Sequence, residues 1–144
     1  MISGISFQFL LYYCLKKVIG LKPTFIPGLL WLVIATILLT LPGSSFPTDD
    51  WLSRIWFDKW VHIGLFAIAV VLWCWALQSK YTERNALVKA FGICAAAWLG
   101  YGVGMEFVQR YFIVNRSFDA GDIIADAVGC ATGLIFSLRR YIKK

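Results

Sequence analysis

Charged residues are scarce in this 144-residue chain. Asp, Glu, Lys and Arg make up 15% of it, against about 25% in an ordinary soluble domain. Hydrophobic residues account for 60%, and the mean hydropathy is +0.72. This composition excludes a water-soluble globular domain and indicates an integral membrane protein.

The sequence signatures of several enzyme classes are also missing. The chain contains no Walker loop, no Rossmann glycine fingerprint and no His-Glu-x-x-His sequence, so nucleotide and zincin chemistry have no sequence signal here. The net charge of +6 does not indicate a nucleic-acid partner, because the cations form short groups beside apolar segments. No Cys-x-x-Cys pair is present, and the cysteines are expected to pack as small hydrophobic residues: Cys14, Cys74, Cys94 and Cys130.

Four apolar segments approach the length of about 20 residues that a spanning helix needs. These segments predict an all-α fold, a four-helix membrane bundle. Because neither a linker nor an internal repeat divides the chain, residues 1–144 are expected to form a single domain. The predicted spans are Pro27 to Leu41, Lys59 to Leu77, Ala90 to Val108 and Asp122 to Leu138.

Two further segments are predicted to lie in the membrane interface. The apolar stretch from Ile5 to Leu15 is too short to span and is expected to form an N-terminal interfacial helix. Between the first two spans, Thr48 is a candidate N-cap for a short amphipathic helix that lies flat, with Trp51 and Trp56 on its apolar face.

The distribution of lysine and arginine predicts the orientation of the bundle. Ten of the fourteen cations lie in the N-terminal segment, in the loop between the second and third spans, and after the fourth span. Because positively charged loops stay in the cytoplasm, both termini are expected there. Seven of the eight acidic residues then fall at or near the outer leaflet.

Ionisable groups inside membrane helices are costly, so their presence indicates a function. Helical spacing pairs Asp58 with His62, Glu106 with Gln109, and Asp122 with Asp126. Small-xxx-small pairs of glycines in the third and fourth spans predict that these two helices pack tightly. Arg116, between them, is then the expected counter-ion of Glu106 and Asp126. The glycine pairs are Gly100 with Gly104 and Gly129 with Gly133.

Simpler structural roles are open for several of these residues. Asp119 is a candidate N-cap of the fourth helix, with Asp122 at its third position, where the helix dipole favours an acid. Lys59 suits an interfacial anchor beside Trp60. His62, the only histidine, suits a hydrogen bond to a neighbouring carboxylate.

These residues occur in an order that resembles the VanZ-like family of small bacterial membrane proteins. The matching motifs are Leu41-Pro42-Gly43, Asp58-Lys59-x-x-His62, Glu106-x-x-Gln109 and Arg116-x-x-Asp119-x-x-Asp122-x-x-x-Asp126. The resemblance implies a four-helix protein of the bacterial cytoplasmic membrane, in a family named from a cluster for resistance to glycopeptides such as teicoplanin. It implies no established reaction. The family usually has asparagine at the position of Asp126.

Three functional classes follow. The first is an accessory protein that binds an anionic, amphiphilic or lipid-linked envelope ligand at the outer leaflet through Lys59, His62 and Arg116. The second is a hydrolase or transferase of polyprenyl phosphate or another envelope lipid, in which Asp58 polarises His62 and the acids hold a hard cation. The third is a small ion-coupled transporter. Binding is favoured, because no serine or cysteine lies near His62. No cofactor is specified. The candidate site comprises Asp58, Lys59, His62, Glu106, Gln109, Arg116, Asp119, Asp122 and Asp126.

Overall fold

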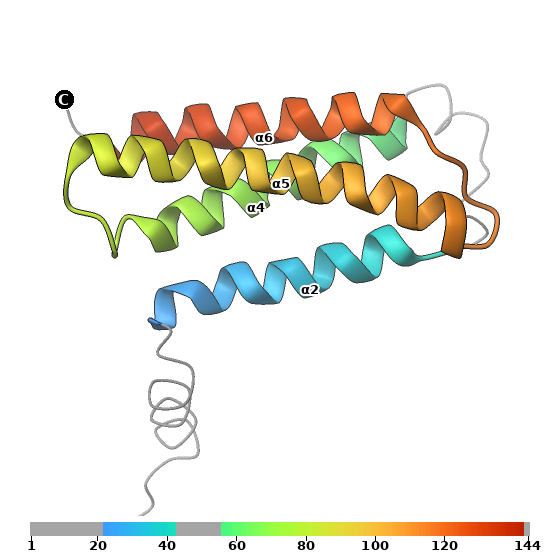
Figure 1. The fold of residues 1–144 in the computed structure, drawn as a ribbon, viewed down its shortest axis with the longest axis horizontal. Helices are drawn as coiled ribbons and strands as arrows, with labels where there is room; N and C mark the ends of the chain where they lie inside the picture. Colours follow the sequence, from blue (N-terminus) through green and yellow to red (C-terminus); the bar gives the residue numbers. More distant parts are fainter. Residues whose placement is uncertain (1–21, 43–55, 143–144) are drawn as a thin grey trace, which may run out of the picture.

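The computed structural model describes residues 22–42 and 56–142, and all of their regular structure is helical (Figure 1). The elements are a short 3₁₀ helix η1 (Pro23–Phe25), then α2 (Ile26–Thr40), α4 (Phe57–Leu77), α5 (Arg84–Phe112) and α6 (Ala120–Tyr141). The predicted interfacial segments, Ile5 to Leu15 and the stretch after Thr48, lie outside the described residues except for Trp56.

All four α-helical segments are long and apolar enough to cross a membrane, which confirms the predicted all-α fold with four spans. Large apolar side chains point outward from the bundle: Leu30 is 60% exposed, Ile93 60% and Ile124 66%. Such a surface is expected where lipid, and not water, surrounds the helices. The protein is a small multi-pass membrane protein.

Helices α5 and α6 are longer than their apolar runs. α5 begins with Arg84, six residues before the predicted Ala90, and continues through Phe112. α6 begins two residues before Asp122, because the side chain of Asp119 caps it by accepting a hydrogen bond from the Gly121 amide at 2.7 Å. The polar ends of both helices therefore extend beyond the segments that hydropathy identifies.

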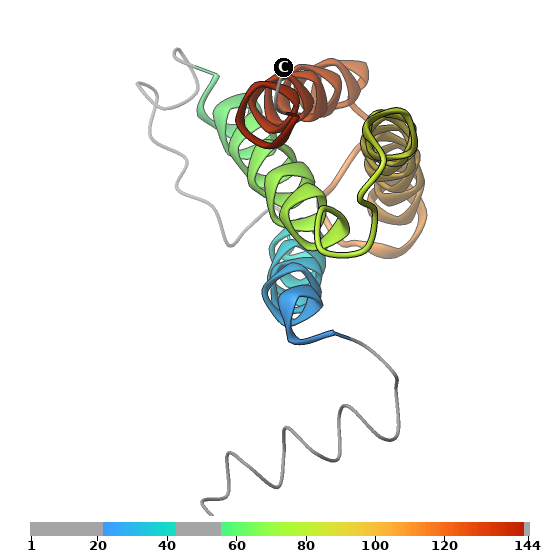
Figure 2. The same ribbon diagram turned by 90° about the vertical axis from the view of Figure 1, so that its left-hand side faces the viewer.

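Seen end-on, α4, α5 and α6 form a compact group, and α2 lies beside α4 at one edge (Figure 2). Phe66, Val70 and Cys74 of α4 pack with Phe91 of α5 and Cys130 of α6 in the core. The described cysteines are unpaired, as expected of small hydrophobic residues.

The glycine pair of α6 packs on α4, and not on α5 as predicted. A Cβ atom at Gly129 would lie 2.5 Å from the Ile63 carbonyl oxygen, and one at Gly133 would lie 2.6 Å from the Ala67 carbonyl oxygen. Nothing lies within 4 Å of a Cβ at Gly100 or at Gly104, so that pair makes no close contact. The spacing of the glycines in α6 therefore predicted the packing face of this helix correctly, but the helix that packs against it is α4 and not α5.

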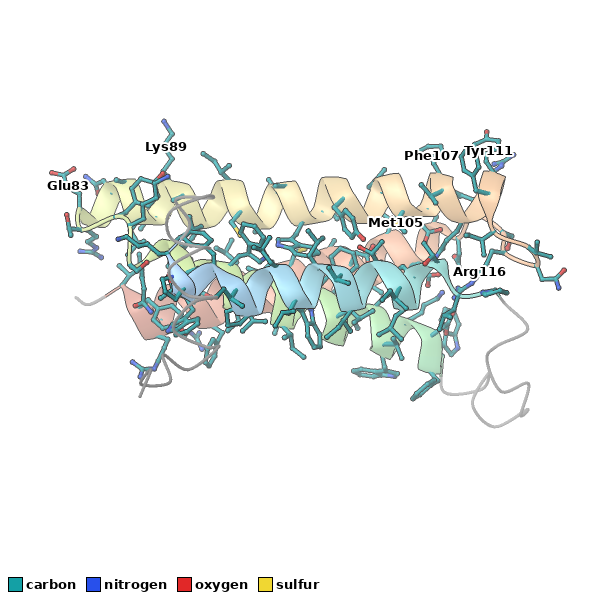
Figure 3. All side chains as sticks on the ribbon, turned by 90° about the horizontal axis from the view of Figure 1, so that it is seen from below. Glu83, Lys89, Met105, Phe107, Tyr111 and Arg116 are labelled. Carbon is teal, nitrogen blue, oxygen red and sulfur yellow. The ribbon has the colours of Figure 1, made fainter. Side chains whose placement is uncertain are left out.

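The two ends of the bundle carry opposite charge. The end that contains the α4–α5 turn, here called the turn end, includes Glu83 and Lys89, whereas Arg116 lies at the opposite, site end (Figure 3). Among the described residues, the turn end has one acid, Glu83, and six cations: Lys22, Lys80, Arg84, Lys89, Arg139 and Arg140. The site end has five acids, Asp58, Glu106, Asp119, Asp122 and Asp126, and three cations, Lys59, Arg110 and Arg116.

Candidate functional site

A polar cluster lies at the site end, where α4 and α6 begin and α5 ends. Its core combines His62 of α4, Glu106 of α5 and two acids of α6, and all four side chains are buried: His62 is 4% exposed, Glu106 1%, Asp122 4% and Asp126 1%. Toward the end of the bundle, Asp119 and Asp58 are 47% and 56% exposed at their side chains. The cluster thus changes from a solvent-accessible rim to a buried floor.

Lys59 is the cation that joins the rim to the floor. Its Nζ lies 2.7 Å from Asp119 Oδ2, 2.8 Å from Asp122 Oδ1 and 3.3 Å from Asp58 Oδ2. The hydrogen bond from Lys59, with that from the Gly121 amide, holds the pKa of Asp119 below its ordinary value. Its Nζ also lies 5.7 Å from the centre of the Trp56 ring, so Lys59 combines the expected interfacial contact with three ion pairs.

His62 is paired with Asp126 across the α4–α6 interface. Its Nδ1 lies 2.8 Å from Asp126 Oδ1. The prediction that Asp58 is its partner is wrong: the carboxylate of Asp58 contacts Lys59 at the exposed rim. The reason is the close approach of α6 to α4 at Gly129, which brings Asp126, one helical turn earlier, opposite His62.

The second ring nitrogen of His62 points to the other buried acids. Nε2 makes no hydrogen bond within the described part of the chain and lies 3.7 Å from Asp122 Oδ2. Ligand atoms of His62, Glu106 and Asp122 all lie within 4.8 Å of one another. Ligand atoms of Asp58, Asp119 and Asp122 also lie within 4.8 Å of one another. The Lys59 ammonium, however, contacts all three of these carboxylates.

Glu106 and the α5–α6 connection are tied together. The Asp119 backbone amide donates to Glu106 Oε2 at 3.0 Å. This bond occupies one oxygen of a fully buried carboxylate and fixes the start of α6 against α5.

The cluster also requires a glycine at position 102 of α5, because a Cβ at Gly102 would clash with Asp126 Oδ2 and with the Phe66 ring. Sequence reasoning did not single out Gly102.

Gln109 and Arg116 bind the end of α2. Gln109 Nε2 donates to the Leu39 carbonyl at 2.8 Å, and Arg116 Nε donates to the Leu41 carbonyl at 3.4 Å. Carbonyl groups at a helix C-terminus have no partner within the helix, and a cation there is favoured by the dipole. The role of Arg116 as the counter-ion of Glu106 and Asp126 stays a prediction. Lys59 pairs with Asp119 and Asp122, and His62 pairs with Asp126.

Comparison with known proteins gives one informative match. The chain is 27% identical over 107 residues to an uncharacterized protein of Schizosaccharomyces pombe. The aligned region is 74% of this chain and 57% of that protein, so the chain spans little more than half the length of its relative. No family model and no solved structure matches. The relative is fungal, whereas the resemblance to the VanZ-like family implies a bacterial membrane.

Proposed function

We propose that the protein binds a divalent metal ion in the polar cluster, with His62, Glu106 and Asp122 as ligands. The observation that carries this proposal is the orientation of His62. A histidine that binds a metal through one ring nitrogen almost always hydrogen-bonds its other nitrogen to a carboxylate or carbonyl group. Here Asp126 holds Nδ1, and the free Nε2 points to Asp122 at 3.7 Å.

The charges of the cluster favour a cation over an anion. Five carboxylates surround one lysine and one histidine. Burial of a charged carboxylate costs free energy unless a cation or a hydrogen bond stabilises it. Among the buried acids, Lys59 contacts only Asp122. One imidazole with two carboxylates is a donor set suited to Zn²⁺ or Mn²⁺.

A bound metal ion also provides a way to bind the anionic ligand that the sequence predicts. An ion with three protein ligands keeps coordination positions open, and a phosphate oxygen of a lipid-linked ligand is a suitable occupant. Lys59 alone is poorly placed to bind such an anion, because three carboxylates already contact it. We therefore propose metal-assisted binding of an anionic lipid at the site end.

A hydrolase or transferase that uses the same metal is the second candidate, supported by the His62–Asp126 pair. Transport has less support, because Phe66, Val70 and Phe91 fill the bundle below the cluster and each is at most 1% exposed. We also propose membership of the VanZ-like family, since its Asp-Lys-x-x-His and Glu-x-x-Gln motifs both lie at the site end.

The test is calorimetric titration of the purified, chelator-treated protein with Zn²⁺ and with Mn²⁺. We expect one site per chain, lost in His62→Ala and in Glu106→Gln. Asp126→Asn should weaken affinity by about 10–100-fold, as loss of a partner that orients a ligand does. Asp58→Asn is the control, because it neutralises an exposed acid outside the ligand set. Absence of binding by either metal, or equal affinity in His62→Ala, would contradict the proposal.

A further inference from the structure

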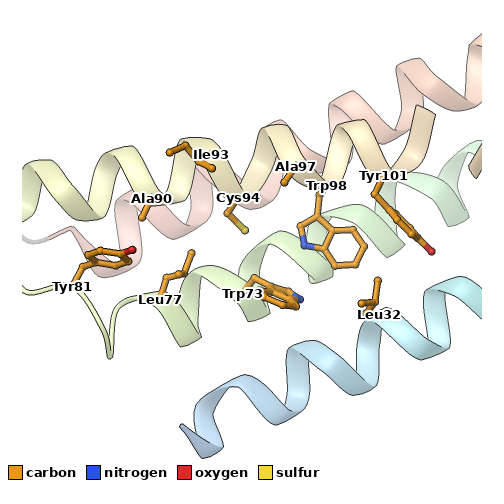
Figure 4. A pocket seen from close by; sticks show the side chains of 10 residues that line it. All are labelled: Leu32, Trp73, Leu77, Tyr81, Ala90, Ile93, Cys94, Ala97, Trp98 and Tyr101. Atoms are coloured by element: carbon orange, nitrogen blue, oxygen red, sulfur yellow. The ribbon is translucent and has the colours of Figure 1, made fainter. Parts of the chain in front are cut away.

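A second feature, at the turn end, is a groove between α2, α4 and α5 (Figure 4). It has a volume of about 390 Å³, within the range of about 300–1,000 Å³ that is typical of small-ligand sites. Apolar and aromatic side chains line it, among them Leu32 of α2, Trp73 of α4 and Trp98 of α5. Ile93, on its edge, is 60% exposed, so the groove opens sideways to the surroundings of the bundle.

The groove covers about half the thickness of a membrane. Its lining on α5 runs from Ala90 to Tyr101, a separation that spans about 16 Å at the rise of an α-helix. The hydrocarbon core of a bilayer is about 30 Å thick. The Tyr101 hydroxyl lies 2.9 Å from Thr36 Oγ1 and joins α5 to α2 at the inner limit of the groove. A spanning helix from another chain is too long for this groove, whereas one lipid chain of a single leaflet matches it.

Two cations lie where the groove meets the turn end. Lys22 Nζ donates to the Ser79 carbonyl at 2.5 Å, and Lys80 Nζ lies 5.6 Å from the centre of the ring of Tyr81, which lines the groove. Both lysines are exposed. A cation at the membrane surface attracts an anionic headgroup.

From this geometry we infer that the groove binds one anionic phospholipid of the leaflet at the turn end. An acyl chain lies between Trp73 and Trp98, and the phosphate contacts Lys22 and Lys80. This site is separate from the polar cluster and does not depend on the metal proposed there.

The experiment is native mass spectrometry of the full chain, released from detergent after incubation with phosphatidylglycerol or with phosphatidylcholine of the same chain length. We expect one retained phosphatidylglycerol per chain. Ala97→Phe fills the groove and should lower that retention at least several-fold. Ala96→Phe is its matched control, because Ala96 is the adjacent exposed alanine and does not line the groove.

The headgroup contact is tested in a second pair of variants. Lys22→Gln combined with Lys80→Gln should reduce the preference for phosphatidylglycerol over phosphatidylcholine by roughly tenfold. Lys89→Gln is the control, because Lys89 points away from the bundle (Figure 3). Equal retention by the Ala97→Phe and Ala96→Phe variants would overturn the chain site. If Ala97→Phe fails to fold, an unchanged preference in the double lysine variant would overturn the inference by itself.

Discussion

Removal of the Lys59 ammonium is expected to destabilise the site end. Its exposed partners, Asp119 and Asp58, are 47% and 56% exposed, and such surface pairs contribute about 0–1 kcal/mol each. Asp122 is only 6% exposed at its side chain, and loss of one partner of a buried pair costs about 3–5 kcal/mol. Because Lys59 itself is 17% exposed, we expect Lys59→Ala to lower the free energy of unfolding by about 3 kcal/mol, at the low end of that range.

The assay is thermal unfolding of the purified protein in detergent with a chelator present, so that metal binding does not contribute. At roughly 2–4 °C per kcal/mol for a chain of this size, the midpoint should fall by about 6–12 °C. Asp122→Asn in the Lys59→Ala background should recover most of the loss. Arg110→Ala, which removes an exposed cation, is the control and should change stability by less than about 0.5 kcal/mol. A loss below about 1 kcal/mol, or no recovery with Asp122→Asn, would refute the assignment of Lys59 as the principal counter-ion.

Three further predictions concern packing, pH and topology. Gly129→Ala should cost about 1–3 kcal/mol in the same assay, because its Cβ meets the α4 backbone, whereas Gly100→Ala should be neutral or stabilising; equal effects would contradict the observed α4–α6 packing. Since the pKa of Asp119 is lowered in the folded state, its pair with Lys59 stabilises the protein above the unfolded pKa of about 3.9, and this contribution disappears as pH falls through the lower folded value. The stability difference between wild type and Asp119→Asn should therefore shrink on acidification from pH 6 to pH 3, and a constant difference would argue against it. A reporter fused after the last residue should be active on the cytoplasmic side, as the excess of cations at the turn end predicts, and activity on the opposite side would reverse the topology.

The overall fold could be predicted from the sequence because a long run of apolar residues identifies a helix that is surrounded by lipid. The gathering of acids at one end was accessible for a related reason: antiparallel spans place the end of one helix beside the start of the next. Asp119 as the N-cap of α6 also followed from local pattern, since capping needs only neighbouring residues.

The pairing of the charges was not accessible, because it depends on which helices touch. Lys59 and Asp122 are 63 positions apart, and His62 and Asp126 are 64 apart. Helical spacing offered Asp58 as a partner of His62, since both lie on one face of α4. The contact of α6 with α4 at Gly129 decided in favour of Asp126. The same packing of α6 on α4 places Lys59 beside Asp122.

Binding of a metal ion by His62, Glu106 and Asp122 can be measured directly by X-ray absorption at the zinc edge of the purified, zinc-loaded protein. We expect one imidazole nitrogen with carboxylate oxygens at about 2.0–2.2 Å and no sulfur in the first coordination sphere. The imidazole signal should be lost in His62→Ala. A sulfur ligand, or a spectrum that is the same in wild type and His62→Ala, would contradict the proposed metal site.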